Sequence, residues 1–428
     1  MRRYESYKDS GVEWLGKIPS QWELTIGMNV FRENKRDNKG MKEKTVLSLS
    51  YGQIIIKPEE KLVGLVPESF ETYQIVEPND IIIRCTDLQN DQTSLRTGLA
   101  KDKGIITSAY LNLKVINNHS AKFLHYYLHT LDITKVLYKF GSGLRQNLSF
   151  LDFKRLPIID IPLSEQQKIA QFLDDKTAKI DQAVDLAEKQ IALLKEHKQI
   201  LIQNAVTRGL NPDVPLKDSG VEWIGQVPEH WEVKKLKFVS KINQHTLPEN
   251  TNGSLSIKYV DIGSVSFENG IEKVENFSFK NAPSRARRLA NRGDIVVSTV
   301  RTYLKAITMV KEEHQDCIFS TGFAVITSNE CLEDNFFELY AKSDAFTEQV
   351  SVFSKGMSYP AINSTDLSNL WITVPPISEQ QKIADYLETQ VSKINQAIAL
   401  KKAHIEKLKE YKSVLINDVV TGKVRVSV

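Results

Sequence analysis

The stretch PLSEQQKIA at residues 162–170 returns as PISEQQKIA at residues 376–384. The likeness continues for the length of a long helix, and neither copy contains a glycine or a proline before its end. Ser164 and Ser378 each follow a proline closely and precede Glu-Gln-Gln, which is typical of a capped helix start. The repeat therefore predicts two long helices, with Ser164 and Ser378 as their N-caps.

Apolar residues recur at every seventh position along both predicted helices, which is the pattern of a coiled-coil seam. Lys198 and Lys412 interrupt this pattern at equivalent places, where they either fix the register or extend toward solvent. The alternative is that each apolar stripe packs on its own globular half, as most amphipathic helices do. The predicted seam consists of Leu173, Ile180, Val184, Ile191, Leu194, Leu201, Leu387, Val391, Ile394, Ile398, Ile405, Leu408 and Leu415.

A second element, KDSGVEWLGKIPSQWE at residues 8–23, returns as KDSGVEWIGQVPEHWE at residues 217–232, and eleven of the sixteen positions are identical. Four of the five tryptophans lie in these two arms. We expect their indole rings to anchor each arm on the helices or on the neighbouring domain; a surface for a partner protein is the alternative. The four residues are Trp14, Trp22, Trp223 and Trp231.

The two repeats indicate one duplicated unit rather than a solenoid, which would need at least about three shorter repeats. The segments between the repeats mix helix and strand patterns, so the predicted fold class is α+β. They share a framework but differ in most side chains, which favours two related modules that read different targets. The predicted parts are a first arm (1–23), a first domain (24–161), a central long helix (162–210), a linker and second arm (211–232), a second domain (233–375) and a C-terminal long helix with a tail (376–428).

The 428 residues carry 56 basic and 53 acidic side chains, and this net charge of +3 alone indicates no particular partner. The charge is uneven, since residues 281–305 hold six basic residues against one acidic and residues 101–145 hold seven against two. Three cysteines do not make a disulfide framework, and no apolar run approaches the ~18 residues of a membrane span. The first residues lack the pattern of a secretory signal. We therefore expect a cytoplasmic protein with no membrane contact.

No catalytic residue and no metal ligand is predicted. The chain lacks the motifs of a dinucleotide site, a phosphate-binding loop and a nucleophile elbow. Asp80 and Asp294 precede buried strands and could suggest metal carboxylates, but a turn before each strand explains them better. These observations favour a protein that binds over one that catalyses.

The paired SGVEW arms and the paired SEQQKIA helices together resemble the specificity subunit of type I restriction–modification systems. The resemblance covers the whole chain, in the order usual for the family. It implies two pseudo-symmetric target-recognition domains separated by two long helices that form an antiparallel coiled coil. It also implies that each domain reads one part of a split, asymmetric sequence in double-stranded DNA.

The same resemblance implies partners. Two methyltransferase subunits are expected to bind this chain, and restriction subunits would join through them. S-adenosylmethionine, ATP and Mg are expected on those subunits, with no cofactor bound by this chain. The alternatives are a specificity subunit of a methylation-only or type IIG-like system, a self-sufficient DNA-modifying enzyme, and a coiled-coil adaptor that does not bind DNA.

Contacts to DNA bases need polar or Arg side chains on exposed loops, and contacts to phosphates need Lys or Arg. Weaker candidates stand in a charge run that is usually a solvated face: Lys35, Arg36, Lys39, Lys42 and Lys44. The stronger candidates are Arg84, Thr86, Asp87, Arg145 and Asn147 in the first domain, and Arg285, Arg287, Arg288, Arg292, Arg301, Tyr303, Lys355, Ser358 and Tyr359 in the second.

Overall fold

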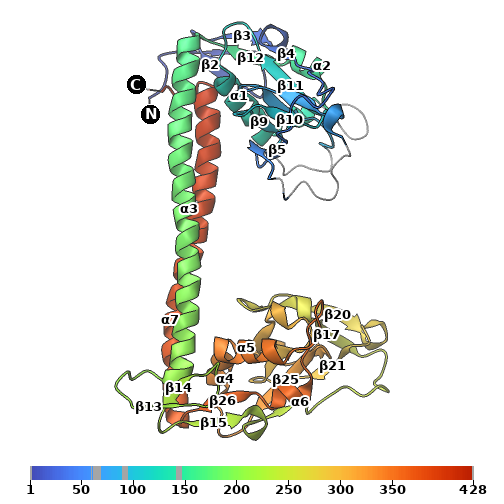
Figure 1. The fold of residues 1–428 in the computed structure, drawn as a ribbon, viewed down its shortest axis with the longest axis vertical. Helices are drawn as coiled ribbons and strands as arrows, with labels where there is room; N and C mark the ends of the chain where they lie inside the picture. Colours follow the sequence, from blue (N-terminus) through green and yellow to red (C-terminus); the bar gives the residue numbers. More distant parts are fainter. Residues whose placement is uncertain (1, 59, 61–68, 89–94, 141–146, 427–428) are drawn as a thin grey trace. The chain divides into compact units, whose positions relative to one another are not determined.

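The computed structural model describes residues 2–58, 60, 69–88, 95–140 and 147–426. The chain divides into two compact units, each built from one α/β domain and half of each long helix (Figure 1). Unit 1 contains residues 1–187 and 402–428, and unit 2 contains residues 188–401. Within the described residues, no helix is both long and apolar enough to cross a membrane.

The centre of unit 1 is a four-stranded sheet with the order β4-β11-β8-β9, in which all neighbours are antiparallel. Its middle strand β8 is completely buried over three isoleucines, because α1 covers one face and the β5–β6 hairpin lies near the other. The elements are β1 Tyr7–Asp9, β2 Lys17–Pro19, β3 Glu23–Ile26, β4 Phe31–Glu33, β5 Leu47–Ser50, β6 Gln53–Ile56, β7 Gln74–Val76, β8 Ile81–Arg84, β9 Thr97–Leu99, β10 Gly104–Ile106, β11 Tyr110–Val115, α1 Ala121–Ile133, α2 Phe150–Arg155 and β12 Pro157–Asp160.

Unit 2 repeats this sheet as β16-β25-β22-β23 and adds a second four-stranded sheet, β20-β17-β24-β21. In the second sheet β17 and β24 are parallel. The two domains therefore share the first sheet and differ in the strands that lie beside it. The elements are β13 Leu216–Asp218, β14 Gln226–Pro228, β15 Glu232–Lys235, β16 Ser240–Ile242, β17 Ser256–Val260, β18 Val265–Ser266, β19 Gly270–Ile271, β20 Glu275–Ser278, β21 Ala286–Leu289, β22 Ile295–Ser298, β23 Ile307–Met309, β24 Cys317–Ser320, β25 Phe323–Ser328, α4 Asp334–Ala341, α5 Asp344–Phe353, α6 Ser364–Ser368 and β26 Trp371–Val374.

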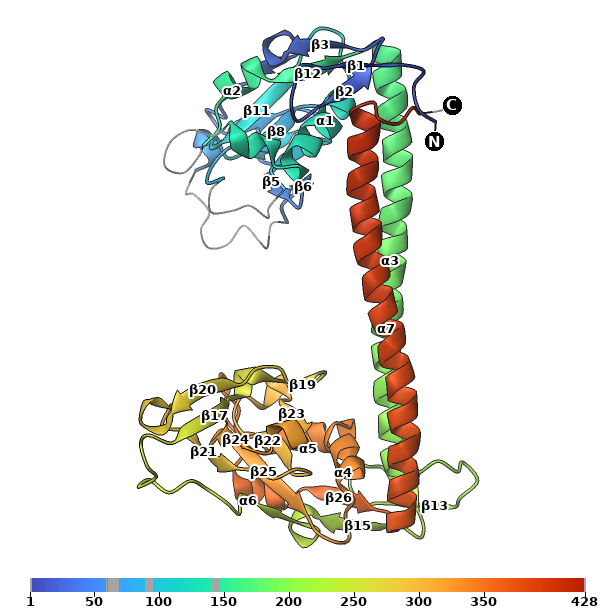
Figure 2. The same cartoon turned by 180° about the vertical axis from the view of Figure 1, so that it is seen from behind.

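The two long helices are α3, Leu163–Arg208, and α7, Ile377–Val420. They run side by side in opposite directions within each unit (Figures 1 and 2). In unit 1, Lys412 Nζ binds Asp181 at 2.6 Å, and in unit 2, Lys198 Nζ donates to Asn395 Oδ1 at 3.2 Å. The two lysines that interrupt the apolar pattern therefore cross to the partner helix. Every residue of the predicted seam is buried or partly buried, and Leu173 and Leu387 also belong to the core of their own domain.

The predicted N-caps lie two residues too far along the chain. Both helices begin before their serine, so Ser164 and Ser378 lie in the first turn. The carbonyls of Pro162 and Pro376 accept the first helical hydrogen bonds, at 2.8 to 3.0 Å. A proline can hold this position because a helix start needs no backbone N–H.

In each unit a tryptophan of the repeated arm donates a hydrogen bond to a glutamate at the start of the long helix. Trp22 is completely buried and its Nε1 donates to Glu165 on α3 at 3.1 Å. Trp231 is equally buried and donates to Glu379 on α7 at 2.9 Å. Two of the predicted tryptophan anchors are thereby confirmed as contacts to the helices. The other two rings, Trp14 and Trp223, are half-buried and pack beside Tyr127 and Phe353.

The first glutamine after each glutamate links the helix to its domain. Gln166 accepts from the N–H of Ser120, the N-cap of α1, and Gln380 accepts from the N–H of Glu333, the N-cap of α4, both at 2.8 Å. Both glutamines are completely buried, and both donate to a carbonyl just before their own helix. The Glu-Gln-Gln motif is thus a docking device, since one residue holds the arm and the next holds the domain.

Candidate nucleic-acid interface

In unit 1 the loop that follows β8, residues 85–88, brings predicted residues from two parts of the chain together. The N–H of Asp87 donates to Asn147 Oδ1 at 3.0 Å, and the N–H of Leu148 donates to the carbonyl of Cys85 at 2.9 Å. Asp87 has a positive φ of 62°, which turns the loop sharply. Thr86 and Asp87 are partly exposed. The fifth predicted residue, Arg145, lies outside the described residues.

In unit 2 the equivalent loop follows β22 and spans residues 299–305. Arg301 lies over the ring of Tyr359, 5.2 Å from its centroid, so two predicted residues from separate loops stack. A cation over an aromatic face is attractive, and an Arg held in this way still has free N–H groups. Tyr303 and Tyr359 are 60% and 66% exposed, unusual for tyrosine, and Ser358 is exposed as well. This part of the surface is available to a ligand.

Lys355, the remaining predicted residue of this group, is also exposed and lies 4.0 Å from Asp366 Oδ2. An ion pair this long and this exposed contributes little stability. Lys355 can therefore leave Asp366 and bind a phosphate group with little loss of free energy.

The basic run of unit 2 does not form one patch. Arg285 precedes β21 and is exposed, while Arg287 lies over the ring of Phe279 and Arg288 donates to Thr246. Arg292 lies before β22, at the opposite end of that strand from Arg301, with Glu312 3.7 Å away. Arg285 is connected to the β22 loop through the backbone, since its carbonyl accepts from the N–H of Thr321. Thr321 adjoins Gly322, whose carbonyl accepts from the N–H of Thr299.

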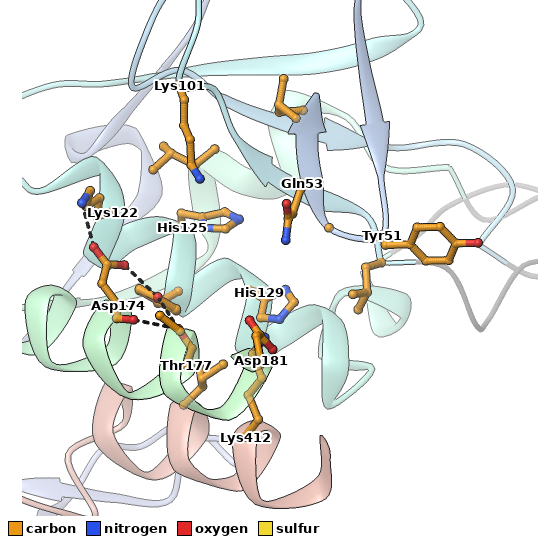
Figure 3. Close-up of a pocket in the computed structure, with 17 residues that line it drawn as sticks. Tyr51, Gln53, Lys101, Lys122, His125, His129, Asp174, Thr177, Asp181 and Lys412 are labelled. Atoms are coloured by element: carbon orange, nitrogen blue, oxygen red, sulfur yellow. Dashed lines mark hydrogen bonds and ion pairs between the residues drawn. The ribbon is translucent and has the colours of Figure 1, made fainter. Parts of the chain in front are cut away.

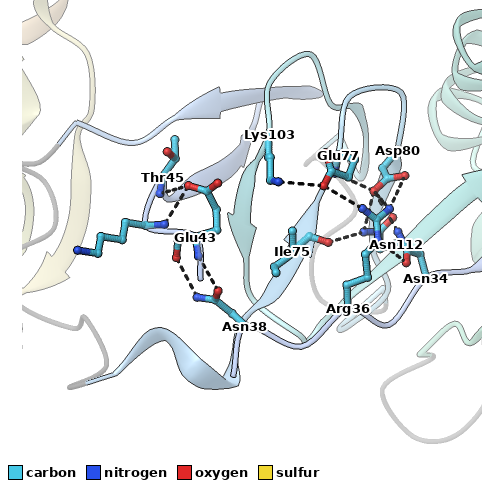
Figure 4. Close-up of polar contacts among 11 residues, drawn as sticks. Asn34, Arg36, Asn38, Glu43, Thr45, Ile75, Glu77, Asp80, Lys103 and Asn112 are labelled. Carbon is cyan, nitrogen blue, oxygen red and sulfur yellow. Dashed lines mark hydrogen bonds and ion pairs between the residues drawn. The ribbon is translucent and has the colours of Figure 1, made fainter. Parts of the chain in front are cut away.

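Two of the weaker candidates in unit 1 form ion pairs within the domain, and one of these involves a buried carboxylate. Arg36 donates to both oxygens of Asp80 and lies 3.4 Å from Glu77 (Figure 4). Asp80 is buried, so this ion pair and the amides of Asn34 and Asn112 supply the hydrogen bonds that its carboxylate needs. Lys35 pairs with Glu33, whereas three exposed lysines remain at the surface: Lys39, Lys42 and Lys44.

The prediction that Asp80 and Asp294 belong to turns is confirmed. Asp80 Oδ2 accepts from the N–H of Glu77 at 2.9 Å, and Asp294 Oδ2 accepts from the N–H of Asn291 at 2.7 Å. Each carboxylate thereby closes the turn before the central strand. Across the described residues, no group of three or more His, Cys, Asp or Glu could hold a metal ion.

A cavity of about 420 Å³ lies in unit 1 between α1, the β5–β6 hairpin and the paired helices (Figure 3). His125 and His129 of α1 face it, and buried ring nitrogens, Nε2 of His125 and Nδ1 of His129, make no hydrogen bond within the described residues. Burial lowers the pKa of His125 to about 4 and the pKa of His129 to about 3. Both imidazoles are therefore neutral at pH 7. Asp181 and Lys412 line the same cavity.

The sequence predictions missed two features of this domain. The prediction of no metal ligand rested on the expectation that the histidines form no His-x-x-x-His pair, and this expectation is wrong because His125 and His129 form one. Arg96 is completely buried beneath the β8 loop, and no local pattern marks it, because its burial depends on residues distant in sequence.

A family model described as the type I restriction modification DNA specificity domain matches residues 29–195 and 228–410. The type I restriction enzyme MjaVIII specificity subunit of Methanocaldococcus jannaschii is 26% identical over 365 residues, which cover 82% of this chain and 80% of that protein.

Two solved structures share the fold. A chain from a structure described as the basis of complex assembly and conformational transition of the type I R-M system has a TM-score of 0.70 and 16% identity, with 95% of this chain and 99% of that chain covered. The HsdS subunit from Thermoanaerobacter tengcongensis has a TM-score of 0.54 and 16% identity, covering 95% of this chain and 98% of its own.

Proposed function

This chain belongs to the family of type I restriction–modification DNA specificity proteins, and we propose that its two units read the two parts of a split, asymmetric DNA sequence. The observation that carries this proposal is the contrast within the duplication. Both units place a loop after the central strand of the same sheet, but the side chains on the two loops differ. Equal frameworks with unequal loops suit a target whose two parts differ in sequence.

The polar groups of the loops fit base and phosphate recognition. Arg301 can reach a guanine edge with two N–H groups, and the exposed tyrosines beside it offer hydroxyls and flat faces. In unit 1, Asp87 and Asn147 offer hydrogen-bond acceptors, and Asn147 offers a donor as well. Lys355 and Arg285 suit phosphates. A net charge of only +3 supports the view that much of the non-specific grip on DNA comes from partner subunits.

The partners follow from the same proposal. Two methyltransferase subunits would bind this chain and carry S-adenosylmethionine, and restriction subunits would join through them with ATP and Mg. This chain would supply recognition without catalysis, in the cytoplasm. The relative from Methanocaldococcus jannaschii is itself named as a specificity subunit, which supports this division of labour.

The test is to map methylated adenines in cells that express this chain with its methyltransferase partner. Replacing residues 24–161 by the corresponding segment of a relative should change one part of the methylated motif and leave the other part unaltered. Replacing residues 233–375 is the matched control and should change the other part. A methylation pattern that stays the same after both exchanges would refute the proposal.

A further inference from the structure

The guanidinium group of Arg96 lies under the β8 loop and binds its backbone. Arg96 Nη1 donates to the carbonyls of Arg84 at 3.3 Å and Thr86 at 2.7 Å, and Nη2 donates to the carbonyl of Asp87 at 3.1 Å. The side chain is completely buried. One planar cation therefore satisfies three carbonyls of the segment that carries the predicted DNA-reading residues of unit 1.

The surroundings fix the orientation of this cation. Arg96 Nε donates to the hydroxyl of Tyr138 at 3.0 Å, and the guanidinium carbon lies 5.2 Å from the centroid of the Tyr138 ring. The backbone N–H of Arg96 donates to Asp132 Oδ2 at 2.5 Å. Asp132 is buried as well, so its hydrogen bond holds the backbone of Arg96 within the core of the unit. Only arginine offers several N–H donors in a rigid fork, so lysine cannot reproduce these contacts.

We propose that Arg96 is a positioning residue for DNA reading by unit 1. It does not touch DNA; it fixes the backbone from which Thr86 and Asp87 project, opposite the contact between Asp87 and Asn147. Readout of base edges requires donors and acceptors in fixed places, so a loose loop loses discrimination among bases before it loses affinity. This inference rests on the proposed function and adds to it a residue outside the predicted interface.

Unit 2 has no arginine at the position equivalent to Arg96. The N–H of Arg84 donates to the carbonyl of Arg96 at 2.8 Å, and at the same place in unit 2 the N–H of Ser298 donates to the carbonyl of Ala306 at 2.9 Å. Alanine has no side chain to reach the loop. Backbone contacts hold both loops, since the N–H of Leu148 donates to the carbonyl of Cys85 in unit 1 and the N–H of Ile362 donates to the carbonyl of Thr299 in unit 2. The role of Arg96 therefore belongs to one unit, and its loss should affect one part of the target.

The experiment compares Arg96→Met with Leu131→Ala in the complex with the methyltransferase partner. Leu131 is buried on α1 beside Asp132, and its side chain has no hydrogen-bond donor for the loop carbonyls, so L131A is a control for general loss of stability in the same unit. Methylation rates are measured on duplexes that carry single base changes in either part of the motif. A melting curve defines a temperature at which both variants are folded.

We expect R96M to reduce discrimination at the unit 1 part by about 10- to 100-fold, the range given by losing one well-placed base contact, with the other part unaffected. L131A should keep both parts. Arg96→Lys retains the charge without the fork and should lie between the wild type and R96M, which keeps the test valid if R96M does not fold.

Two results would overturn the proposal: full discrimination in folded R96M or R96K, or equal loss of discrimination in L131A. A wild-type complex without any split motif would refute the proposed function instead, so the two failures are distinguishable.

Discussion

In unit 1 the buried cation of Arg96 binds three backbone carbonyls of β8 and the loop after it, whereas in unit 2 alanine occupies the equivalent position. A backbone hydrogen bond from the segment before the long helix holds the loop in both units. The docking contacts are the same in both units: a tryptophan on a glutamate and a glutamine on the N-cap of the first domain helix. The duplication thus preserved the contacts that attach each domain to the helices. The contacts that support the proposed DNA-reading loops differ between the two units.

The faces turned toward the long helices differ in the same way. His125 and His129 of α1 are equivalent in sequence to Glu338 on α4 and Lys342 directly after it. The pair in unit 2 forms an ion pair at 2.7 Å, while buried ring nitrogens of the pair in unit 1 are without hydrogen bonds in the described structure. Unit 1 should therefore respond to pH in this region and unit 2 should not.

The largest expected effect is a loss of stability that a substitution in the core of one unit causes in that unit alone. Leu173 in unit 1 and Leu387 in unit 2 are equivalent and completely buried, and each belongs to the core of its own unit. Replacing either by alanine should cost about 2 to 5 kcal/mol of the free energy of unfolding. Calorimetry should show that each substitution lowers the melting temperature of a different transition. A single transition that both variants shift equally would mean that the chain unfolds as one cooperative unit.

The next effect is the pH response of unit 1. The folded-state pKa values of His125 and His129, about 4 and about 3, lie below the unfolded value of ~6.5. Between these limits the unfolded chain binds more protons, so stability falls as pH decreases from about 6.5. From pH 7 to pH 5 we expect the free energy of unfolding of unit 1 to fall by about 2 kcal/mol. This is less than two fully buried histidines would contribute, because both side chains are partly exposed.

Thermal melting at the two pH values checks this expectation. The double variant His125→Gln, His129→Gln is the control and should remove most of the pH dependence of the unit 1 transition. If the double variant shows the same pH dependence as the wild type, the histidines are not its cause.

A smaller effect concerns the arms. Trp22→Phe and Trp231→Phe each remove one hydrogen bond to a helix glutamate and keep most of the apolar contact. Glu165 retains the hydroxyl of Tyr4 and Glu379 retains the ring of His230, so neither carboxylate is left without a partner. Each substitution should lower the free energy of unfolding of its own unit by about 1 to 2 kcal/mol, which denaturant unfolding measures. A loss that differs strongly between the two would break the equivalence of the docking contacts.

How much of this could be predicted depends on where the determining contacts lie. The helices follow from local sequence, since SEQQKIA and the apolar period act over a few turns. The N-caps were misplaced because Pro162 and Pro376 start the helix through their carbonyls, which a side-chain rule does not anticipate. Arg36 was predicted as a surface charge, but the buried Asp80 needs it. Arg96 could not be found, because its partners are brought to it by the fold.

The smallest effect distinguishes the two lysines of the helix pair. Lys412 forms an exposed ion pair with Asp181, so Lys412→Met should cost less than about 1 kcal/mol, and the difference should shrink in high salt. Burial lowers the pKa of Lys198, and its partner Asn395 is uncharged. Lys198→Met should therefore be neutral or slightly stabilising, with a smaller salt dependence than Lys412→Met. Unfolding at low and high salt measures both, and equal salt dependence would contradict the distinction.

The central claim is that the two units read different parts of one DNA sequence. It is tested most directly by selecting bound duplexes from a randomised library with the intact complex, using the wild type, Arg84→Ala and Arg301→Ala. The account predicts two separate blocks of fixed bases, with Arg84→Ala relaxing one block and Arg301→Ala relaxing the other. A single continuous block, or two variants that relax the same block, would contradict it.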